Sequence, residues 1–308
     1  MPWRTLLYRL GLLVGLALFG YQFWQALSAL WAHPGAVTAP GYLGIAIGID
    51  VLAYLCLMLG WAILMRAVGV ALSATQVSDG YMLSFLPRYV PGTIWGYLSR
   101  SEWLAQSAGV SYRQSGIASA MEVCLQVLTA ATVAVFLLAS ALWQIVAAGL
   151  GIVVSMAAWH WGPQLWSRLD RGSRDLRPIR LPWRYLLAVL AVYAGFWYLH
   201  GLSTWLVARS IGAAGTLTAV SATPIFAASW LIGFLVVLVP SGLGVREWTL
   251  NYLLVANAGM PAEAATFVAV VVRLAIIVAE LLLLLWAATR SAGAIWRQRS
   301  KDEKQNVT

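Results

Sequence analysis

The chain has 308 residues, of which 61% are hydrophobic and only 10% are charged, and its mean hydropathy is +0.78. Soluble globular domains carry about 25% charged residues, so this composition excludes an ordinary soluble domain and indicates a polytopic membrane protein. The net charge of +9 does not predict a nucleic-acid partner, because the arginines cluster beside apolar segments, where membrane topology accounts for them.

Six apolar runs are long enough to cross a membrane as helices, which takes roughly 20 residues for about 30 Å of hydrocarbon. They lie near residues 6–31, 41–65, 115–139, 142–161, 184–208 and 264–289. The first run is longer than a signal-peptide core, so we interpret it as a retained transmembrane helix. Cys56 and Cys124 fall inside apolar segments, which favours a packing role over a disulfide or a metal site.

Basic residues predict how these helices are oriented. The segment 161–184 carries six arginines against two aspartates, and residues 290–308 are also basic, whereas residues 32–41 and the turn near Ser140 carry no charge. Loops rich in Lys and Arg stay in the cytoplasm. We therefore expect a multi-pass protein of the cytoplasmic (inner) membrane, with both termini in the cytoplasm and residues 290–308 as a cytoplasmic tail.

Two further apolar stretches, residues 79–107 and 219–257, are interrupted near their middle by Pro91 and Pro240 and by neighbouring glycines. The pattern of basic loops requires each stretch to begin and end on one side of the membrane, the first on the cytoplasmic side and the second on the outer side. Either a re-entrant helical hairpin or a pair of short crossings satisfies this. Broken helices at membrane depth occur where they face protein or a watery cavity, so the breaks predict an internal cavity.

The two broken stretches are similar in sequence. Placing their prolines over one another aligns "VPGTIWGYLSRSEW" with "VPSGLGVREW", so that Arg100 corresponds to Arg246. Chance alignment of Pro and Gly breaks is the alternative, but entry from opposite sides favours an inverted repeat, which places binding sites at broken helices. The prediction is a single all-α membrane domain, residues 1–308, with about six full transmembrane helices, two Pro/Gly-broken re-entrant hairpins and repeats over about 41–139 and 184–289.

Charges at membrane depth are costly unless they are paired or hydrated, so each one marks a candidate site. The candidates are Asp50, Arg88, Glu122, Arg246, Glu247, Arg273 and Glu280. Arg273 and Glu280 are two helical turns apart and share a face, and Glu122 offers Arg273 an opposite charge across the bundle. Ion pairs that merely lock helices together are the alternative for any one residue, but three arginines near two breaks exceed that need.

The breaks also predict an anion site. Short helices that begin after Pro91 and Pro240 present free N–H groups and positive dipole ends, and the planar guanidinium of Arg246 suits phosphate. The expected substrate-binding residues are Arg246, Arg273, Arg88, Trp95, Gly92, Gly242 and Gly244. The residues expected to form ion pairs or to exchange protons are Glu122, Glu247, Glu280 and Asp50. Of these, Glu247 is expected to tether an arginine.

The chain contains 17 tryptophans. Six of them fall near predicted span ends, where an aromatic belt is usual, namely Trp24, Trp31, Trp61, Trp159, Trp161 and Trp183. Only Trp95 and Trp248 lie close enough to a break to belong to a site.

The two proline-containing segments resemble a known family, the transmembrane, flippase-like domain of lysylphosphatidylglycerol synthases and its stand-alone relatives. "LPRYVPGTIWGYLSR" from Leu86 looks like that family's first Pro-Gly signature, and "VPSGLGVRE" from Val239 looks like its second, with Ser241 in place of the usual glycine. The resemblance implies re-entrant helices and movement of charged or phosphate-bearing lipids between leaflets. It carries over to Pro91, Gly92, Trp95, Gly96, Pro240, Gly242, Gly244, Arg246 and Glu247. Because Thr308 closely follows the last span, we expect no aminoacyl-transfer domain and no enzyme activity.

We therefore expect a flippase or facilitator for an anionic lipid of the cell envelope, such as a polyprenyl-phosphate carrier or a phosphatidylglycerol derivative, without a cofactor. The sequence contains no nucleotide-binding loop, so transport is expected to be passive or coupled to a proton or ion. Glu122 or Glu280 would provide that coupling. Envelope-biosynthesis enzymes are further expected partners.

Two other functions fit parts of the sequence. A scaffold for envelope glycolipid enzymes would use the arginines of residues 168–184, although topology already accounts for them. An intramembrane serine hydrolase would use Ser241 and His200, but His200 is expected near the outer, interfacial end of its helix. His33 and His160 show no metal-ligand spacing, so no metal site is predicted.

Overall fold

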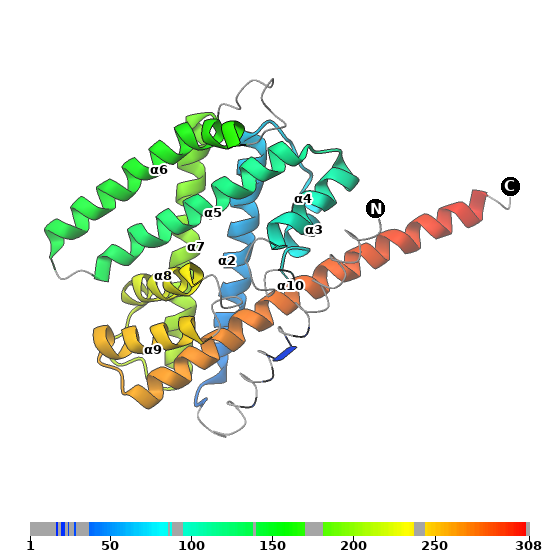
Figure 1. The fold of residues 1–308 in the computed structure, drawn as a ribbon. Helices are drawn as coiled ribbons and strands as arrows, with labels where there is room; N and C mark the ends of the chain where they lie inside the picture. The colour runs from blue at the N-terminus through cyan, green and yellow to red at the C-terminus, as the bar shows by residue number, and fades with distance from the viewer. Residues whose placement is uncertain are drawn as a thin grey trace.

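The computed structural model describes residues 37–85, 87, 95–137, 140–169, 181–236 and 244–305, and positions 17, 20, 21, 24 and 28. Within these residues the chain forms nine α-helices, α2 to α10, with one short 3-10 helix and no strand (Figure 1). The all-α fold of a polytopic membrane protein is therefore confirmed. Most of the first predicted span, residues 6–31, lies outside the described residues together with Trp31, and this span stays a prediction.

Five helices are long and apolar enough to cross a membrane. They are α2 (Pro40–Ala67), α5 (Tyr112–Ala134, extended by the 3-10 helix Val135–Leu137), α6 (Ala141–Leu169), α7 (Trp183–Ser210) and α10 (Ala262–Gln305). These five match the last five predicted spans. The 28 residues of α2 extend about 42 Å at a rise of about 1.5 Å per residue, which exceeds a hydrocarbon core of about 30 Å.

Hydrogen bonds between helix ends show which ends lie together. At one end of the bundle, named end A, the side-chain amide of Gln114 in the first turn of α5 donates to the carbonyl of Val68 after α2, across 3.2 Å. At the opposite end, named end B, the N–H of Ala39 before α2 donates to the carbonyl of Ser210 at the end of α7, across 3.0 Å. Because α2 runs from end B to end A, α7 is antiparallel to it, and the two stand side by side at the centre of Figure 1.

Four shorter helices form two pairs, α3 (Ala74–Met82) with α4 (Trp95–Ala108), and α8 (Ala219–Leu235) with α9 (Val245–Ala258). The first pair follows α2 and leads into α5, so α3 starts and α4 finishes at end A. The second pair follows α7, and the hydroxyl of Thr216 donates to the carbonyl of Ala258 across 3.2 Å. α8 therefore starts and α9 finishes at end B, and the two pairs lie on different sides of the central helices (Figure 1).

Reciprocal side-chain caps begin α3 and α8. The N–H of Gln76 donates to the hydroxyl of Ser73 across 3.2 Å, while the N–H of Ser73 donates to the side-chain carbonyl of Gln76 across 2.9 Å. Thr218 and Ser221 exchange the equivalent two bonds before α8, at 3.2 and 3.0 Å. Such a capping box satisfies two backbone donors that the helix leaves unpaired, so each helix begins at a polar residue near an end of the bundle.

Two helices extend beyond their predicted spans. α6 continues through Pro163 to Leu169 rather than ending near residue 161, and α10 continues to Gln305 rather than ending near residue 289. The predicted spans follow the apolar runs, whereas the Ala, Arg, Lys, Glu and Gln residues after position 290 are good helix formers in water. The segment predicted as a tail from residue 290 is therefore helical as far as Gln305.

The long helices differ in how much of their apolar surface the protein buries. In α10, 67% of the most apolar stretch is buried, against 6% in α6, so α10 runs through the core and α6 presents its apolar side chains to lipid. Trp24, Trp161 and Trp183 are exposed, as an aromatic belt requires. The belt prediction is wrong for Trp61 and Trp159, which are 0% and 1% exposed because they pack inside the bundle.

Glycines allow three helices to approach closely. A Cβ on Gly201 of α7 would lie 2.5 Å from the Cα of Thr223 on α8, and a Cβ on Gly233 of α8 would lie 3.0 Å from the Cβ of Arg246 on α9. Because protein interiors are close-packed, a larger side chain at either position requires a neighbouring helix to move. These two contacts fix α8 between α7 and α9.

Candidate functional site

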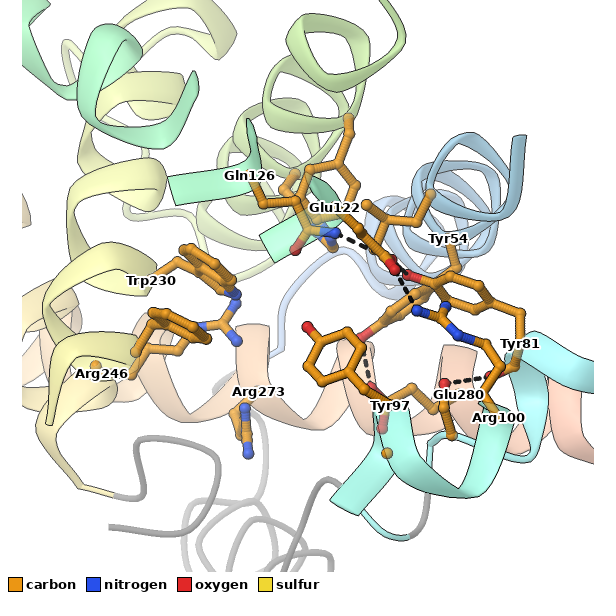
Figure 2. A pocket seen from close by; sticks show the side chains of 17 residues that line it. Tyr54, Tyr81, Tyr97, Arg100, Glu122, Gln126, Trp230, Arg246, Arg273 and Glu280 are labelled. Carbon is orange, nitrogen blue, oxygen red and sulfur yellow. Dashed lines mark hydrogen bonds and ion pairs between the residues drawn. The ribbon is translucent and has the colours of Figure 1, made fainter. Parts of the chain in front are cut away.

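A cavity of about 140 Å³ lies where the two short-helix pairs meet the long helices (Figure 2). Residues of α2, α4, α5, α7, α8, α9 and α10 line it, together with residues of α3 and the turn after it. Its ionisable lining residues are Tyr54, Tyr81, Tyr97, Arg100, Glu122, His200, Arg246, Arg273 and Glu280. The structure thus brings four of the predicted site residues, Glu122, Arg246, Arg273 and Glu280, into one space.

The cavity lies midway along the long helices. Glu122 follows the first residue of α5 by ten positions, and Arg273 follows the first residue of α10 by eleven. At about 1.5 Å per residue both lie about 15 Å from a helix start, and α5 starts at end A whereas α10 starts at end B. These charges therefore lie near the middle of a hydrocarbon core about 30 Å thick, where an uncompensated ion is costly.

One side of the cavity holds a closed ion pair. The guanidinium of Arg100 pairs with the carboxylate of Glu122, and each side chain is only 1% exposed. The hydroxyl of Tyr81 and the amide of Gln126 donate to the same carboxylate, across 2.8 and 3.3 Å. The Arg100 guanidinium also lies 4.4 Å from the ring centroid of Trp61, a cation–π arrangement. Both charges are therefore largely satisfied within the protein.

The pairing of Glu122 corrects two sequence-based predictions. Glu122 contacts Arg100, so the prediction that it pairs with Arg273 is wrong, and Arg100 is a site residue that the sequence analysis did not include among its candidates. Arg100 is the sixth residue of α4, whereas Arg246 is the second residue of α9. The two arginines thus occupy different helical turns, and aligning the prolines set them opposite one another wrongly. The sequence signal that could have marked Arg100 is its position in the stretch after Pro91, 22 residues before Glu122.

A second ion pair lies on the α9 and α10 side. The Nε of Arg273 is 3.4 Å from Oε1 of Glu247, and the two side chains are 9% and 21% exposed. The other carboxylate oxygen of Glu247 accepts the N–H of Gly244, across 2.8 Å, and Gly244 has the positive φ of 75° that starts α9. Glu247 therefore tethers an arginine, as predicted, and also takes one of the backbone donors that the predicted anion site would use.

Arg246 differs from the other two cavity arginines. It is partly buried, and its guanidinium carbon lies 4.7 Å from the ring centroid of Phe226 on α8. Within the described part of the chain, it has no carboxylate at ion-pair distance. Figure 2 shows Arg246 beside Trp230 on one side of the cavity and Arg100 beside Tyr81 on the other. Arg246 therefore presents a positive charge to the cavity that a ring contact compensates only in part.

Asp50 and His200 form a buried polar group at the cavity wall. Oδ1 of Asp50 lies 2.8 Å from Nδ1 of His200, Oδ2 accepts the hydroxyl of Ser203 across 2.8 Å, and Asp50 is fully buried. His200 is 3% exposed and lines the cavity. The prediction of an interfacial His200 is therefore wrong, because Asp50 on α2 holds the ring inside the bundle.

Glu280 is also hydrogen-bonded. The hydroxyl of Tyr54 on α2 donates to its carboxylate across 2.5 Å. Glu280 and Arg273, predicted to share a face of one helix, both line the cavity. The carboxylate is thus held by a neutral donor in a buried position.

The remaining predicted site residues contribute less to the described cavity. Trp95 begins α4 but does not line the cavity, and Trp248 is 67% exposed and stacks on Tyr252, so the placement of Trp248 in the site is wrong. Trp230, which no sequence pattern marks as a site residue, lines the cavity instead. The predicted residues that lie outside the described ones are Arg88, Pro91, Gly92, Pro240, Ser241 and Gly242.

Five apolar spans, two interrupted helix pairs and a charged cavity at mid-membrane depth define a polytopic membrane protein with an internal polar site. Residues 8–284 match the model of the family described as the lysylphosphatidylglycerol synthase TM region, and the chain belongs to this family. The resemblance inferred from the two proline-containing segments is thereby confirmed. Comparison with curated proteins gives no match.

Proposed function

We propose that the protein moves an anionic, phosphate-bearing lipid across the bilayer, with the head group passing through the cavity. Membership of the lysylphosphatidylglycerol synthase TM family supports a role in handling lipids. The observation that carries the proposal is Arg246, a cavity-facing arginine without a carboxylate at ion-pair distance among the described residues.

The local arrangement of charges around Arg246, rather than the net charge of the cavity, favours an anionic ligand. Arg100 and Arg273 each have a carboxylate neighbour, in Glu122 and Glu247, whereas Arg246 contacts a ring. An arginine at membrane depth is costly without a counter-charge. A phosphate group supplies that charge and accepts two parallel hydrogen bonds from a guanidinium fork. Such a ligand would stabilise Arg246 in the position that it already occupies.

The size of the cavity favours a head group rather than acyl chains. Its volume is about 140 Å³, close to the engineered cavity of about 150 Å³ that accommodates benzene. Trp230 and Phe234 stack with ring centroids 5.0 Å apart on its wall. Such a space suits a phosphate with a few attached atoms, so the acyl or polyprenyl chains would remain in the bilayer.

The two short-helix pairs support an alternating route, in which they act as re-entrant hairpins of an inverted repeat. α4 and α9 each have 14 residues, and each is followed by a glycine of positive φ, Gly109 at 61° and Gly259 at 62°. In each turn a backbone N–H then reaches back to a leucine carbonyl in the preceding helix, at 3.2 and 3.4 Å. One pair starts from end A and the other from end B, as an inverted repeat requires.

Sidedness follows from the basic residues. Residues 161–184 and the C-terminal residues 290–308 are both basic, and the neighbouring helix ends lie at end A. We assign end A to the cytoplasm by the positive-inside rule, which supports a cytoplasmic C-terminus. A cytoplasmic N-terminus and a location in the cytoplasmic membrane are further parts of the proposal. Envelope-biosynthesis enzymes that make or consume the lipid would be its partners.

The proposal describes a transporter rather than an enzyme. In a serine hydrolase, His200 would be the general base and Asp50 would orient its ring, and the contact between them is compatible with those roles. However, the neighbouring hydroxyl of Ser203 donates to Asp50 rather than to His200. Ser203 is therefore not activated as a nucleophile by His200.

The test uses mass spectrometry to identify the lipids that gently purified protein retains. It compares the wild type with Arg246→Ala and Arg209→Ala. Arg209 is the matched control, because it is an exposed arginine near end B that contacts the ring of Tyr42 outside the cavity. We expect the wild type and Arg209→Ala to enrich one phosphate-bearing lipid. Arg246→Ala should lose about tenfold or more of it, since a charge-assisted hydrogen bond contributes about 1.5–3 kcal/mol.

Equal retention by the wild type and Arg246→Ala at matched folding would contradict the proposal, and a bulk-membrane profile in all three proteins would favour a scaffold. A lipid identified in this way is then used in proteoliposomes that contain only the purified protein. Movement of the lipid between leaflets, reduced in Arg246→Ala but not in Arg209→Ala, is the expected result.

A further inference from the structure

The proposed phosphate site at Arg246 does not use the buried Asp50 and His200 pair. Asp50 is 0% exposed and His200 is 3% exposed, yet His200 lines the cavity. Of the two histidines that the structure describes, His160 and His200, only His200 lines this space. Histidine is the side chain whose ordinary charge change falls between pH 5 and 8, so its position beside an anion site has a chemical consequence.

The hydrogen bonds assign the proton-binding atom. An ionised carboxylate only accepts hydrogen bonds, so Nδ1 of His200 donates to Asp50, and Ser203 donates to the other oxygen. In neutral His200 the lone pair is then on Nε2, which makes no hydrogen bond to any described residue. A further proton would therefore have to bind at Nε2, beside the carboxylate of Asp50.

One ring connects this histidine to Arg246. The His200 ring stacks on Phe226 with centroids 4.6 Å apart, and the Arg246 guanidinium carbon lies 4.7 Å from the same centroid. The imidazole and the guanidinium are therefore within about 9 Å of each other, a separation at which two charges interact appreciably in a partly buried site. A positive charge on His200 thus acts on whatever Arg246 binds.

We propose that the cavity binds a proton at Nε2 of His200 cooperatively with an anionic head group at Arg246. The inference rests on the proposed function and adds a co-substrate to it. Without an anion, Arg246 repels the imidazolium, and with an anion bound that repulsion is offset. Each ligand therefore strengthens binding of the other by the same factor, and a head group that crosses with its proton moves with a smaller net charge.

Other charged groups near His200 are arranged consistently with this linkage. Tyr54 of α2 lies edge-on to the His200 ring, with centroids 6.0 Å apart, and donates to Glu280 of α10. Asp50 and Glu280 favour the imidazolium, whereas Arg246 and Arg273 oppose it. Arg100 and Glu122 across the cavity form their own pair and largely cancel. An anion bound at Arg246 would offset one of the two charges that oppose the imidazolium, which is the linkage proposed.

The experiment measures binding of phosphatidylglycerol to purified protein in phosphatidylcholine nanodiscs at pH 5 and pH 8. A phosphodiester probe is required, because a phosphomonoester itself titrates with a pKa of about 6. For the wild type we expect binding at least about fivefold tighter at pH 5, the lower limit of ordinary coupling between sites. In His200→Gln, which keeps a hydrogen-bond donor toward Asp50, we expect less than about a twofold difference.

His160→Gln is the matched control, because His160 is exposed on α6 and stacks on Trp183 away from the cavity. It should retain the wild-type pH dependence. Lipid binding that does not change with pH in the wild type, or that changes equally in His200→Gln, overturns the proton site and leaves the proposed function intact. If phosphatidylglycerol does not bind at either pH, two claims fail. The proton site at His200 is overturned, and so is the binding of this head group at Arg246.

A second measurement needs no variant. By reciprocity, anionic lipid added to wild-type protein in weakly buffered solution near the midpoint of the pH dependence must cause proton uptake. Phosphatidylcholine added in the same way should cause none. Binding without proton uptake contradicts the proposal even if His200→Gln fails to fold.

Discussion

The two sides of the cavity are built from the same parts with opposite charge. On one side, a 14-residue helix, α4, supplies the cation Arg100 and the long helix α5 supplies the anion Glu122. On the other side, a helix of the same length, α9, supplies the anion Glu247 and the long helix α10 supplies the cation Arg273. Each side therefore pairs a short helix with the long helix that follows it.

The pairs differ in how completely they are closed. Arg100 and Glu122 are each 1% exposed and have aromatic and polar neighbours, whereas Arg273 and Glu247 are 9% and 21% exposed and are 3.4 Å apart. The closed pair leaves little charge for a ligand, whereas the partly open pair lies beside a further arginine. Under the proposed function, the α4–α5 side would therefore be structural and the α9–α10 side would bind the head group.

The largest expected effect separates the two carboxylates. Glu122→Gln keeps the shape of the side chain but leaves the charge of Arg100 buried without its partner, which should destabilise the protein by about 3–5 kcal/mol. Glu247→Gln acts on a more exposed pair and should cost about 1 kcal/mol. Reversible unfolding in mixed micelles measures both changes. Equal losses would break the distinction between a closed and an open side.

A smaller effect is expected at the contact between α8 and α9. Gly233→Ala places a Cβ 3.0 Å from that of Arg246, so overpacking should destabilise the protein by about 1–3 kcal/mol and weaken lipid binding by displacing Arg246. Gly195→Ala on α7 is the control, because its Cβ would meet nothing within 4 Å and alanine favours helix by up to about 1 kcal/mol. Unchanged lipid binding in Gly233→Ala would argue against a fixed position for Arg246.

The smallest effect is expected at the salt bridge that joins the two sides near end A. Arg290 of α10 pairs with Asp79 of α3, and their side chains are 30% and 33% exposed. Exposed pairs contribute about 1 kcal/mol or less, so Asp79→Asn should change the free energy of unfolding by no more than that, and less at high salt. A loss comparable to that of Glu122→Gln would show that α3 and α10 depend on this contact for their docking.

The sequence predicted the features that depend on local pattern. Five apolar runs gave five long helices because a span needs only length and hydropathy, and the Pro/Gly break correctly preceded a helix that begins with Val245 and Arg246. The pairing of Glu247 with an arginine was also predictable, since a lone acid beside a lone base at membrane depth must find opposite charge.

Features that depend on register and long-range contact were not predictable in this way. Arg100, the sixth residue of α4, faces α5 and therefore pairs with Glu122. Aligning the two prolines does not predict which helical turn of α4 faces α5. Asp50 and His200 are 150 residues apart in the chain, so a helix-end rule placed His200 at the interface. Trp230 lines the cavity because of the way α8 packs against its neighbours. Hydropathy along the chain carries no information about that packing.

The continuity of α10 gives it mechanical leverage. Its 44 residues, from Ala262 to Gln305, extend about 66 Å at about 1.5 Å per residue, more than twice the thickness of the hydrocarbon core. Arg273 divides this rod into a short arm toward end B and an arm about three times longer that runs past end A. If this rod tilted about Arg273, its far tip would move about three times as far as its near tip, because the two arms differ in length by that factor.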